Sequence, residues 1–446
     1  MKELYELFVQ STGVCTDSRA VFANCIYFAL KGDSFDGNKF ANEALEKGAN
    51  YAVIDDSSMK VSDKMILVDD VLKTLQQLAN YHRRKLGTLI FGITGSNGKT
   101  TTKELLKSVL SEKFQVVATQ GNLNNHIGVP LTLLSIQAET DIAIVEMGAN
   151  HPEEIAFLCS IVEPDYGYIT SIGKAHLEGF GSFEGVIKTK GELYDYLKKY
   201  NKTIFLNNDD ALQKDLLKNY ENVYSFGNQG NTKVKLKNTH PVEVIFENSA
   251  LRKMTDGIEK PSLLGIGVLD EFTDSTTVVR SNLTGSYNFS NIGVAIAVGK
   301  YFKLPPEAIK RGIEKYVPTN NRSQIINLEG NTIFLDAYNA NPSSMSAAIH
   351  NMLTIESFDK KVLILGDMFE LGKFALTEHQ NIVDLVESHP WKAVFFIGEN
   401  FAKTSTKHPQ FKTFDEFKQA FSFSQFSDCL ILIKGSRGMA LERVIL

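Results

Sequence analysis

The stretch TLIFGITGSNGKTTTKELLKSVLSEKF, residues 88–114, decides the fold of this chain. An apolar, β-branched run comes first, a turn with two glycines follows, and the residues after the turn place apolar side chains at helical spacing. A strand, a glycine turn and a helix in this order are typical of a loop that binds phosphate. The stretch therefore predicts a nucleotide site at the carboxyl end of a parallel strand.

The residue types of this turn fit a nucleoside triphosphate. Glycines allow backbone N–H groups to point at phosphate oxygens, and the N-terminus of the following helix adds favourable charge. We expect Lys99 to reach the β and γ phosphates and Thr100 to offer its hydroxyl to magnesium. The spacing is a variant of GxxxxGK[ST], because Ile93 occupies the position of the first glycine. The predicted nucleotide loop consists of Gly95, Ser96, Asn97, Gly98, Lys99, Thr100 and Thr101.

Two further side chains at predicted strand ends are candidate metal ligands. Glu146 ends the strand-like run in DIAIVEMGAN, and carboxylate oxygens are ligands that Mg²⁺ prefers. His176 follows another strand in TSIGKAHLEGFGS. Parallel strands end at one edge of their sheet, so we expect both residues near the loop. A solvent-exposed carboxylate and a hydrogen-bonded polar histidine are the alternative interpretations.

The length of 446 residues predicts about three domains. Residues 1–86 suggest a small α/β domain that closes with a helix from residue 71 to the last residue before Gly87. Residues 87–311 alternate strands with helices, which predicts a central, P-loop ATPase-like and mostly parallel sheet. Within it, residues 231–284 suggest a small antiparallel insertion. Residues 312–446 predict a C-terminal, Rossmann-like doubly wound sheet.

Composition narrows the class of protein. Apolar residues make up 43% and charged residues 22%, and the net charge of −5 is spread without a long block of one sign. The N-terminus lacks the apolar core of a signal peptide, and no apolar run is long enough to span a membrane. The four cysteines form no CxxC or Cys/His cluster, which favours reduced thiols. We expect a cytoplasmic monomer that binds neither nucleic acid nor membrane.

Motifs along essentially the whole chain resemble the Mur ligase family. The matching segments are CTDSRAV, GDSFDGNKF, TGSNGKTTTKE, TQGNLNNHIGVP, EMGANHPEEI, TSIGKAHLEGFGS, KTKGELYDYL, GSYNFSNIGVAIAVG, DAYNANPSSM and GDMFELG. The resemblance implies a ligase that uses ATP and two Mg²⁺ ions to form a peptide bond on a nucleotide-linked precursor of peptidoglycan. GNLNNHIGVP and DAYNANP favour addition of D-alanyl-D-alanine to UDP-N-acetylmuramoyl-tripeptide over addition of L-alanine, D-glutamate or a diamino acid.

The resemblance also implies a catalytic group made of Lys99, Glu146, His176 and Lys190. The metal ligands would be Thr100, Glu146, His176 and Lys190, the last as a carbamate formed with CO₂. Sequence pattern alone would describe Lys190 as one of many exposed helix cations. A carbamate would give a second magnesium an oxygen ligand where an ammonium would repel it.

Other residues would contact the substrates, according to the same resemblance. Asn288 and Asn291 would lie near the adenine, Arg322 near the phosphates and Asp336 near the ribose. Asn321 stands before Arg322 where many relatives have glycine. The implied substrate contacts are Ser18, Arg19 and the turn 35–37 for the UDP-sugar, Asn124 and Asn125 for the same substrate, and Tyr338, Asn339 and Asn341 for the dipeptide or peptide end. Without the resemblance, the asparagines would be interpreted as turn or helix-capping residues.

The expected reaction passes through an acyl phosphate, because a carboxylate needs a better leaving group before an amine can displace it. No residue in the sequence identifies itself as the base that deprotonates this amine.

Three alternatives stay open at this point. The chain could be a related ligase that adds a diamino acid or extends folate with glutamate. It could be a P-loop kinase or a GTP-driven switch, although no NKxD-type guanine motif is present. It could also be a nucleotide-binding scaffold without activity, against which the retained set of catalytic candidates argues.

Overall fold

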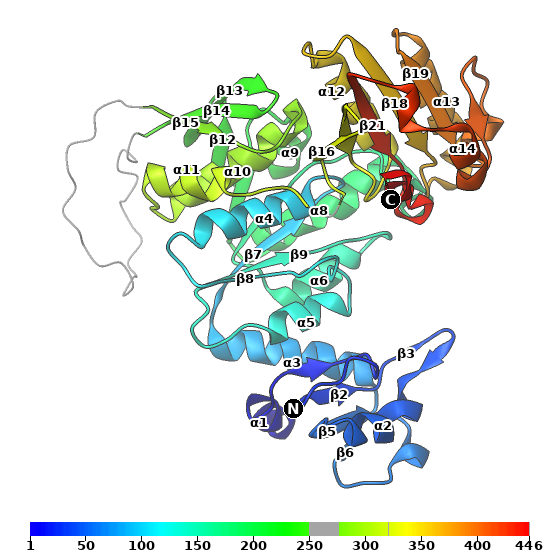
Figure 1. Ribbon diagram of the computed structural model, residues 1–446. Coiled ribbons are helices and arrows are strands. Elements are labelled where there is room, and N and C mark those ends of the chain that lie inside the picture. The colour runs from blue at the N-terminus through cyan, green and yellow to red at the C-terminus, as the bar shows by residue number, and fades with distance from the viewer. Residues whose placement is uncertain (249–275, 320, 446) are drawn as a thin grey trace.

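The computed structural model describes residues 1–248, 276–319 and 321–445. Three units, each built around its own sheet, follow one another along the chain from the blue N-terminus to the red C-terminus (Figure 1). The prediction of three α/β domains is confirmed. None of the helices in these described ranges combines the length and the apolar character needed to cross a lipid bilayer.

The N-terminal unit is a four-stranded parallel sheet in the order β1-β2-β5-β6 with a small β3–β4 hairpin beside it. Its strands are β1 Val14–Cys15, β2 Ile26–Phe28, β3 Lys31–Gly32, β4 Phe35–Asp36, β5 Tyr51–Ile54 and β6 Met65–Leu67. Its helices are α1 Lys2–Val9, α2 Ala41–Glu46 and α3 Val71–Leu86.

Helix α3 forms as predicted and joins the first two units. Asp70 caps its start by accepting a hydrogen bond from the Lys73 N–H, and Gly87 ends it with a left-handed φ of 66°. Along α3, Asn80 donates to the carbonyl of Ile161 at 2.8 Å, and Arg83 donates to the carbonyl of Val162 at 3.0 Å. These bonds fix α3 to the end of α6, so it lies between the two units in Figure 1.

The central unit has one nine-stranded sheet in the order β15-β14-β13-β12-β11-β10-β7-β9-β8. The strands are β7 Leu89–Thr94, β8 Val116–Ala118, β9 Ile142–Glu146, β10 Tyr166–Ile169, β11 Thr203–Asn207, β12 Val223–Gly227, β13 Thr232–Thr239, β14 Val242–Glu247 and β15 Thr276–Arg280. The helices are α4 Lys99–Leu110, α5 Gly128–Leu134, α6 Glu154–Val162, α7 Leu177–Phe180, α8 Phe183–Lys199, α9 Ala211–Leu217, α10 Phe289–Tyr301 and α11 Pro306–Glu314.

The predicted antiparallel insertion is an extension of this sheet. Strand β14 pairs antiparallel with β13 on one side and with β15 on the other, as expected, but β13 also pairs in parallel with β12. The alternating pattern therefore identified the strands correctly and missed that they continue the main sheet. Residues 249–275 of the predicted insertion lie outside the described residues.

The C-terminal unit contains a six-stranded sheet in the order β16-β17-β21-β18-β19-β20, parallel except for the edge strand β16. The strands are β16 Gln324–Leu328, β17 Asn331–Leu335, β18 Lys360–Gly366, β19 Ala393–Ile397, β20 Gln410–Phe411 and β21 Cys429–Lys434. The helices are α12 Pro342–Thr354, α13 Ala375–Glu387 and α14 Phe414–Ala420.

Helix α11 runs across the position between residues 311 and 312 where we expected the third domain to begin. It packs against α4 and α10 of the central unit. The contact is close, because a Cβ on Gly312 would lie 2.6 Å from the Cα of Val109. We therefore propose that the division between the second and third domains follows α11.

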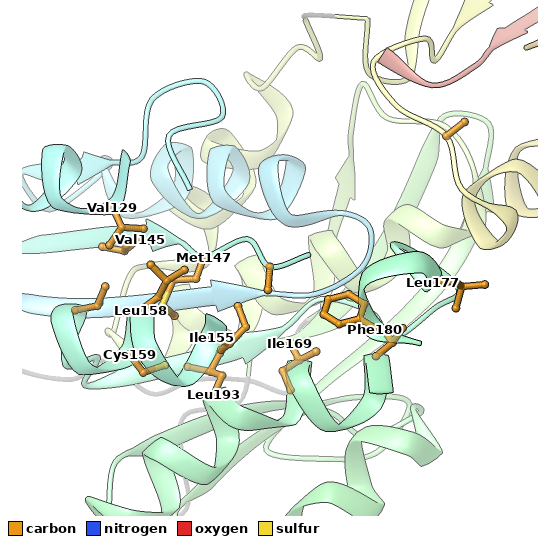
Figure 2. Close-up of a cluster of buried hydrophobic side chains, with 14 of the residues drawn as sticks. Val129, Val145, Met147, Ile155, Leu158, Cys159, Ile169, Leu177, Phe180 and Leu193 are labelled. Carbon is orange, nitrogen blue, oxygen red and sulfur yellow. The ribbon is translucent and has the colours of Figure 1, made fainter. Parts of the chain in front are cut away.

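The buried core beneath the central sheet holds helix α8 in place. Figure 2 shows Ile155 and Leu158 of α6 and Leu193 of α8 gathered with Ile169 of β10. All four side chains are buried, and Gly167 leaves space for Leu193, since a Cβ there would lie 3.2 Å from its Cδ1. This packing determines where the polar residues of α8 can lie.

We predict that Leu193→Ala loosens α8 selectively. Removing a fully buried leucine side chain leaves a cavity and costs about 2–5 kcal/mol. The matched change Leu376→Ala removes a side chain that is 54% exposed and should cost far less. Hydrogen exchange measured on peptides from α8 gives the local opening free energy. Equal exchange from α8 in the two variants would contradict the packing described here.

Candidate active site

A cavity of about 1100 Å³ lies where the carboxyl ends of the central strands face the C-terminal unit. Six of the seven residues of the predicted nucleotide loop line it, and Gly95 is the exception. The opposite wall comes from the C-terminal unit and includes Arg322, Tyr338 and Asn341. The rule that ligand sites form at the carboxyl ends of parallel strands therefore predicted the position of this loop correctly.

Two glycines give the nucleotide loop its shape. Gly95 has a φ of +145°, and a Cβ there would lie 2.2 Å from Thr170 Oγ1. Gly98 has a φ of +82°, and its Cβ would lie 2.7 Å from Asn291 Oδ1. Neither position can accept another residue without moving its neighbours. The loop is thereby held so that α4 begins at Lys99, with the N–H groups of its first turn lacking intrahelical partners.

Lys99 folds back over the loop. Its Nζ donates to the carbonyl of Gly95 at 2.7 Å. Burial lowers the pKa of Lys99, the carboxylate of Glu146 opposes this effect, and the positive charge of Arg322 adds to it. An anion in the cavity would favour the charged ammonium, so the surroundings of Lys99 suit a phosphate group.

Glu146 provides a buried carboxylate beside the start of α4. Its side chain is only 2% exposed. One oxygen, Oε2, accepts a hydrogen bond from Thr100 Oγ1 at 3.1 Å, and the other, Oε1, accepts one from Asn124 Nδ2 at 2.8 Å. Hydroxyl, carboxylate and amide oxygens are hard donors, so this group fits the ligand chemistry of magnesium.

His176 lines the same cavity and faces a residue that sequence analysis did not single out. Its Nδ1 is in contact with the carboxylate of Glu370, which follows β18 in the C-terminal unit. The histidine lowers the pKa of Glu370. Glu370 lies in the GDMFELG segment directly after a predicted strand. That strand-end position is the feature of the sequence that could have identified Glu370 as a candidate site residue.

Lys190 is buried, so its description from sequence pattern as an exposed helix cation is wrong. The residue is 1% exposed, and its Nζ donates to the carbonyl of Ala149 at 3.1 Å. Burial lowers the pKa of Lys190 well below its usual value, and the positive charge of Lys99 lowers it further. Lys190 lies behind the cavity wall, whereas Ala149 lines it.

The two asparagines predicted to lie near adenine line the cavity and also brace the nucleotide loop. Asn291 Nδ2 donates to Asn288 Oδ1 at 2.9 Å. Asn291 Oδ1 accepts a hydrogen bond from Thr102 Oγ1 at 3.0 Å, which connects α10 to α4. Asn288 is the N-cap residue of α10, but its side chain accepts no capping hydrogen bond, so the helix-capping interpretation is wrong. Its Nδ2 instead donates to the carbonyl of Thr284 at 2.8 Å, which is a local turn contact.

The C-terminal unit brings five predicted residues to the cavity, which are Arg322, Asp336, Tyr338, Asn339 and Asn341. The guanidinium carbon of Arg322 lies 3.5 Å from the ring centroid of Tyr338, as in a cation–π contact. Asp336 accepts a hydrogen bond from Lys434, a buried residue that sequence analysis missed. Asn341 Nδ2 donates to Asn97 Oδ1 at 2.7 Å, so the third unit directly contacts the nucleotide loop. Asn341 Oδ1 also caps α12.

The predicted substrate residues divide into two groups. Asn124 and Asn125 line the cavity with Asn339, and Asn125 also accepts a hydrogen bond from the Gly128 N–H at the start of α5. Ser18, Arg19 and the turn 35–37 belong to the N-terminal unit and are not among the described residues that line it. Arg19 pairs with Asp17 at 2.7 Å and lowers the pKa of that carboxyl to about 2.

Three family models match consecutive parts of the chain. They are the Mur ligase family, catalytic domain, at residues 10–83, the Mur ligase middle domain at 93–299, and the Mur ligase, glutamate ligase domain, at 321–437.

Curated proteins match over almost the full length. The UDP-N-acetylmuramoyl-tripeptide--D-alanyl-D-alanine ligase of Bacillus subtilis (strain 168) is 35% identical, with 97% of this chain and 92% of the relative covered. The protein of the same name from Treponema pallidum (strain Nichols) is 33% identical at the same coverage. The crystal structure of MurF ligase from Thermotoga maritima in complex with ADP superposes with a TM-score of 0.81, at 26% identity over 99% of this chain and 97% of that one. The chain belongs to the Mur ligase family.

Proposed function

We propose that this protein joins D-alanyl-D-alanine to the C-terminal carboxylate of UDP-N-acetylmuramoyl-tripeptide and converts ATP to ADP and phosphate. The full-length similarity to relatives that carry the name of this activity is the observation that supports the proposal most strongly. The product would be the pentapeptide precursor of peptidoglycan. A kinase or a GTP switch would share the loop, but it would not share three consecutive Mur ligase domains.

ATP binds, in this proposal, with its phosphates on the loop 95–101. The glycine geometry, the first turn of α4 and the position of Lys99 support this placement. The ADP complex of the relative from Thermotoga maritima supports the use of ATP. Asn288 and Asn291 contact the adenine, Asp336 the ribose and Arg322 the phosphates.

Magnesium fits beside this loop. The oxygens of Thr100 and Glu146 are already adjacent, and His176 lines the same cavity. When bound, two Mg²⁺ ions would stabilise the negative charge of the phosphoryl group during transfer. The positive charge of Lys99 would stabilise the same phosphoryl group, and Lys99 would not transfer a proton.

Lys190 is the proposed site of a carbamate. A carbamate forms when a neutral amine attacks CO₂ and loses a proton, and the lowered pKa of Lys190 favours the neutral amine. The change converts a buried neutral amine into a buried anion, which suits a position near metal ions and near the positive charge of Lys99.

The reaction follows from these positions. The tripeptide carboxylate attacks the γ phosphorus of ATP, the bond to the β–γ bridging oxygen breaks, and ADP leaves. The dipeptide amine then attacks the acyl carbon of the acyl phosphate, loses a proton, and phosphate departs. The tripeptide reaches the cavity past Asn124 and Asn125, while Tyr338, Asn339 and Asn341 contact the incoming dipeptide. The hydrogen bond from Asn341 to Asn97 joins the third unit to the loop, so the intermediate would form between these two units.

We predict that ADP forms at an appreciable rate only when the tripeptide nucleotide and the dipeptide are both present. The reason is that each substrate completes a different wall of the cavity, and the phosphoryl acceptor is the tripeptide carboxylate. A coupled assay of ADP release with each substrate omitted in turn measures this. Rapid release of ADP with ATP alone would contradict the proposal, and a panel of amine acceptors separates it from related ligases.

A second prediction concerns Lys190. Lys190→Ala should abolish ligation, and a small carboxylate such as formate should restore part of it by supplying the missing anion. In wild-type protein supplied with ¹³C-bicarbonate, carbon NMR should detect a carbamate. Because the folded-state pKa of Lys190 is lowered, this signal should persist at neutral pH and disappear as the pH falls far enough to protonate the amine.

The matched control is Lys188→Ala, which removes an exposed lysine from the same helix. It should retain both the NMR signal and full activity. Unchanged activity in Lys190→Ala without added carboxylate would remove Lys190 from the mechanism.

A further inference from the structure

Arg437 is a cavity residue to which neither the sequence nor the proposed reaction has given a role. It follows β21 in the short 3₁₀ helix η7, Arg437–Met439, on the red C-terminal segment that faces the central unit in Figure 1. Its Nη1 pairs with Glu442 Oε1 at 2.7 Å, and its side chain is otherwise 61% exposed. The guanidinium carbon lies 5.9 Å from the ring centroid of Tyr338, so Arg437 is next to the wall proposed to contact the dipeptide.

The other lysine and arginine side chains along the described cavity wall already have partners or a proposed use. Lys99 lies on the nucleotide loop, and Arg322 stacks on Tyr338 beside it. Lys434 is buried and bonded to Asp336 and to the carbonyl of Asn339. Arg437 therefore remains as the strong cation that can meet a second anionic group at a distance from the phosphates.

The proposed dipeptide substrate carries such a group. D-alanyl-D-alanine has an amine at one end and a carboxylate at the other, separated by roughly 7 Å in an extended chain. Its amine must face the acyl carbon, so its carboxylate must contact a different part of the wall. A buried or partly buried carboxylate without a cation would be strongly disfavoured.

We propose that Arg437 binds the carboxylate of the incoming dipeptide, which deepens the proposed function and rests on it. Arginine suits this role because its Nε and Nη2 form a planar fork that matches the two oxygens of a carboxylate. The pair with Glu442 through Nη1 orients the guanidinium and leaves this fork for the ligand. Glu442 is thus a positioning residue, and the ligand-binding group is Arg437.

The test compares D-alanyl-D-alanine with its C-terminal amide as amine acceptors. In wild-type enzyme the amide should raise KM for the acceptor by about 10- to 100-fold, the range expected for losing a hydrogen-bonded charge pair. Arg437→Met should raise KM for the dipeptide by a similar factor, with kcat and the KM values for ATP and the tripeptide nucleotide unchanged. The rise in KM caused by the amide and the rise caused by Arg437→Met should not add. The Arg437→Met enzyme should therefore have similar KM values for the dipeptide and for its amide.

Two control variants separate this role from a structural one. Glu442→Gln breaks the same ion pair but keeps the guanidinium, so it should keep most of the discrimination. Lys412→Met removes an exposed cation of the same unit that is not among the described cavity residues, and it should behave as wild type. Undiminished discrimination in Arg437→Met, or a rise in its KM for ATP, would overturn the inference and leave the proposed function intact. Failure of wild-type enzyme to use D-alanyl-D-alanine at all would instead overturn the proposed function.

Discussion

The turn between β7 and α4 depends on the absence of side chains at two positions. A Cβ at Gly95 would collide with Thr170 Oγ1, and a Cβ at Gly98 would collide with Asn291. Because both glycines are packed so closely, the segment that follows β10 and helix α10 together fix where α4 begins. Asn97 Oδ1 accepts a hydrogen bond from Asn341 Nδ2, so the loop also fixes where the third domain meets the second. The shape of the loop and the junction between the second and third domains therefore depend on the same contacts.

The parts of this structure that sequence could predict are those determined by local pattern. The sequence predicted the strand, the glycine turn and the helix around the loop, and all three are present. It also predicted Glu146 at a strand end near the loop, and Glu146 lies 3.1 Å from Thr100 Oγ1. Helix α3 was predicted together with Gly87 at its end, and the structure adds Asp70 as the residue that caps its start. In each case the signal lies within a short stretch of chain, and the physics of parallel sheets brings strand ends together.

What sequence could not predict depends on partners distant along the chain. Lys190 has the pattern of a surface residue, and only the packing of α8 under the sheet shows that it is buried. His176 of the second domain faces Glu370 of the third. Asp336 faces Lys434 within the third domain, 98 residues further along the chain. The strands after residue 231 have a clear alternating pattern, but pattern does not determine which neighbour they pair with, so their continuation of the main sheet was missed. The roles of Arg322 and Tyr338 were predicted from the family resemblance alone. The stacking of the two side chains is visible only in the structure.

The central claim is that a triphosphate binds on the turn between β7 and α4 with its terminal phosphate beside Lys99 and Glu146. A crystal structure with a non-hydrolysable ATP analogue and Mg²⁺ tests it most directly. The account predicts phosphate density against the N–H groups of the first turn of α4, with a metal ion in contact with Thr100 and Glu146. Nucleotide density elsewhere, with this turn lacking phosphate, would contradict it.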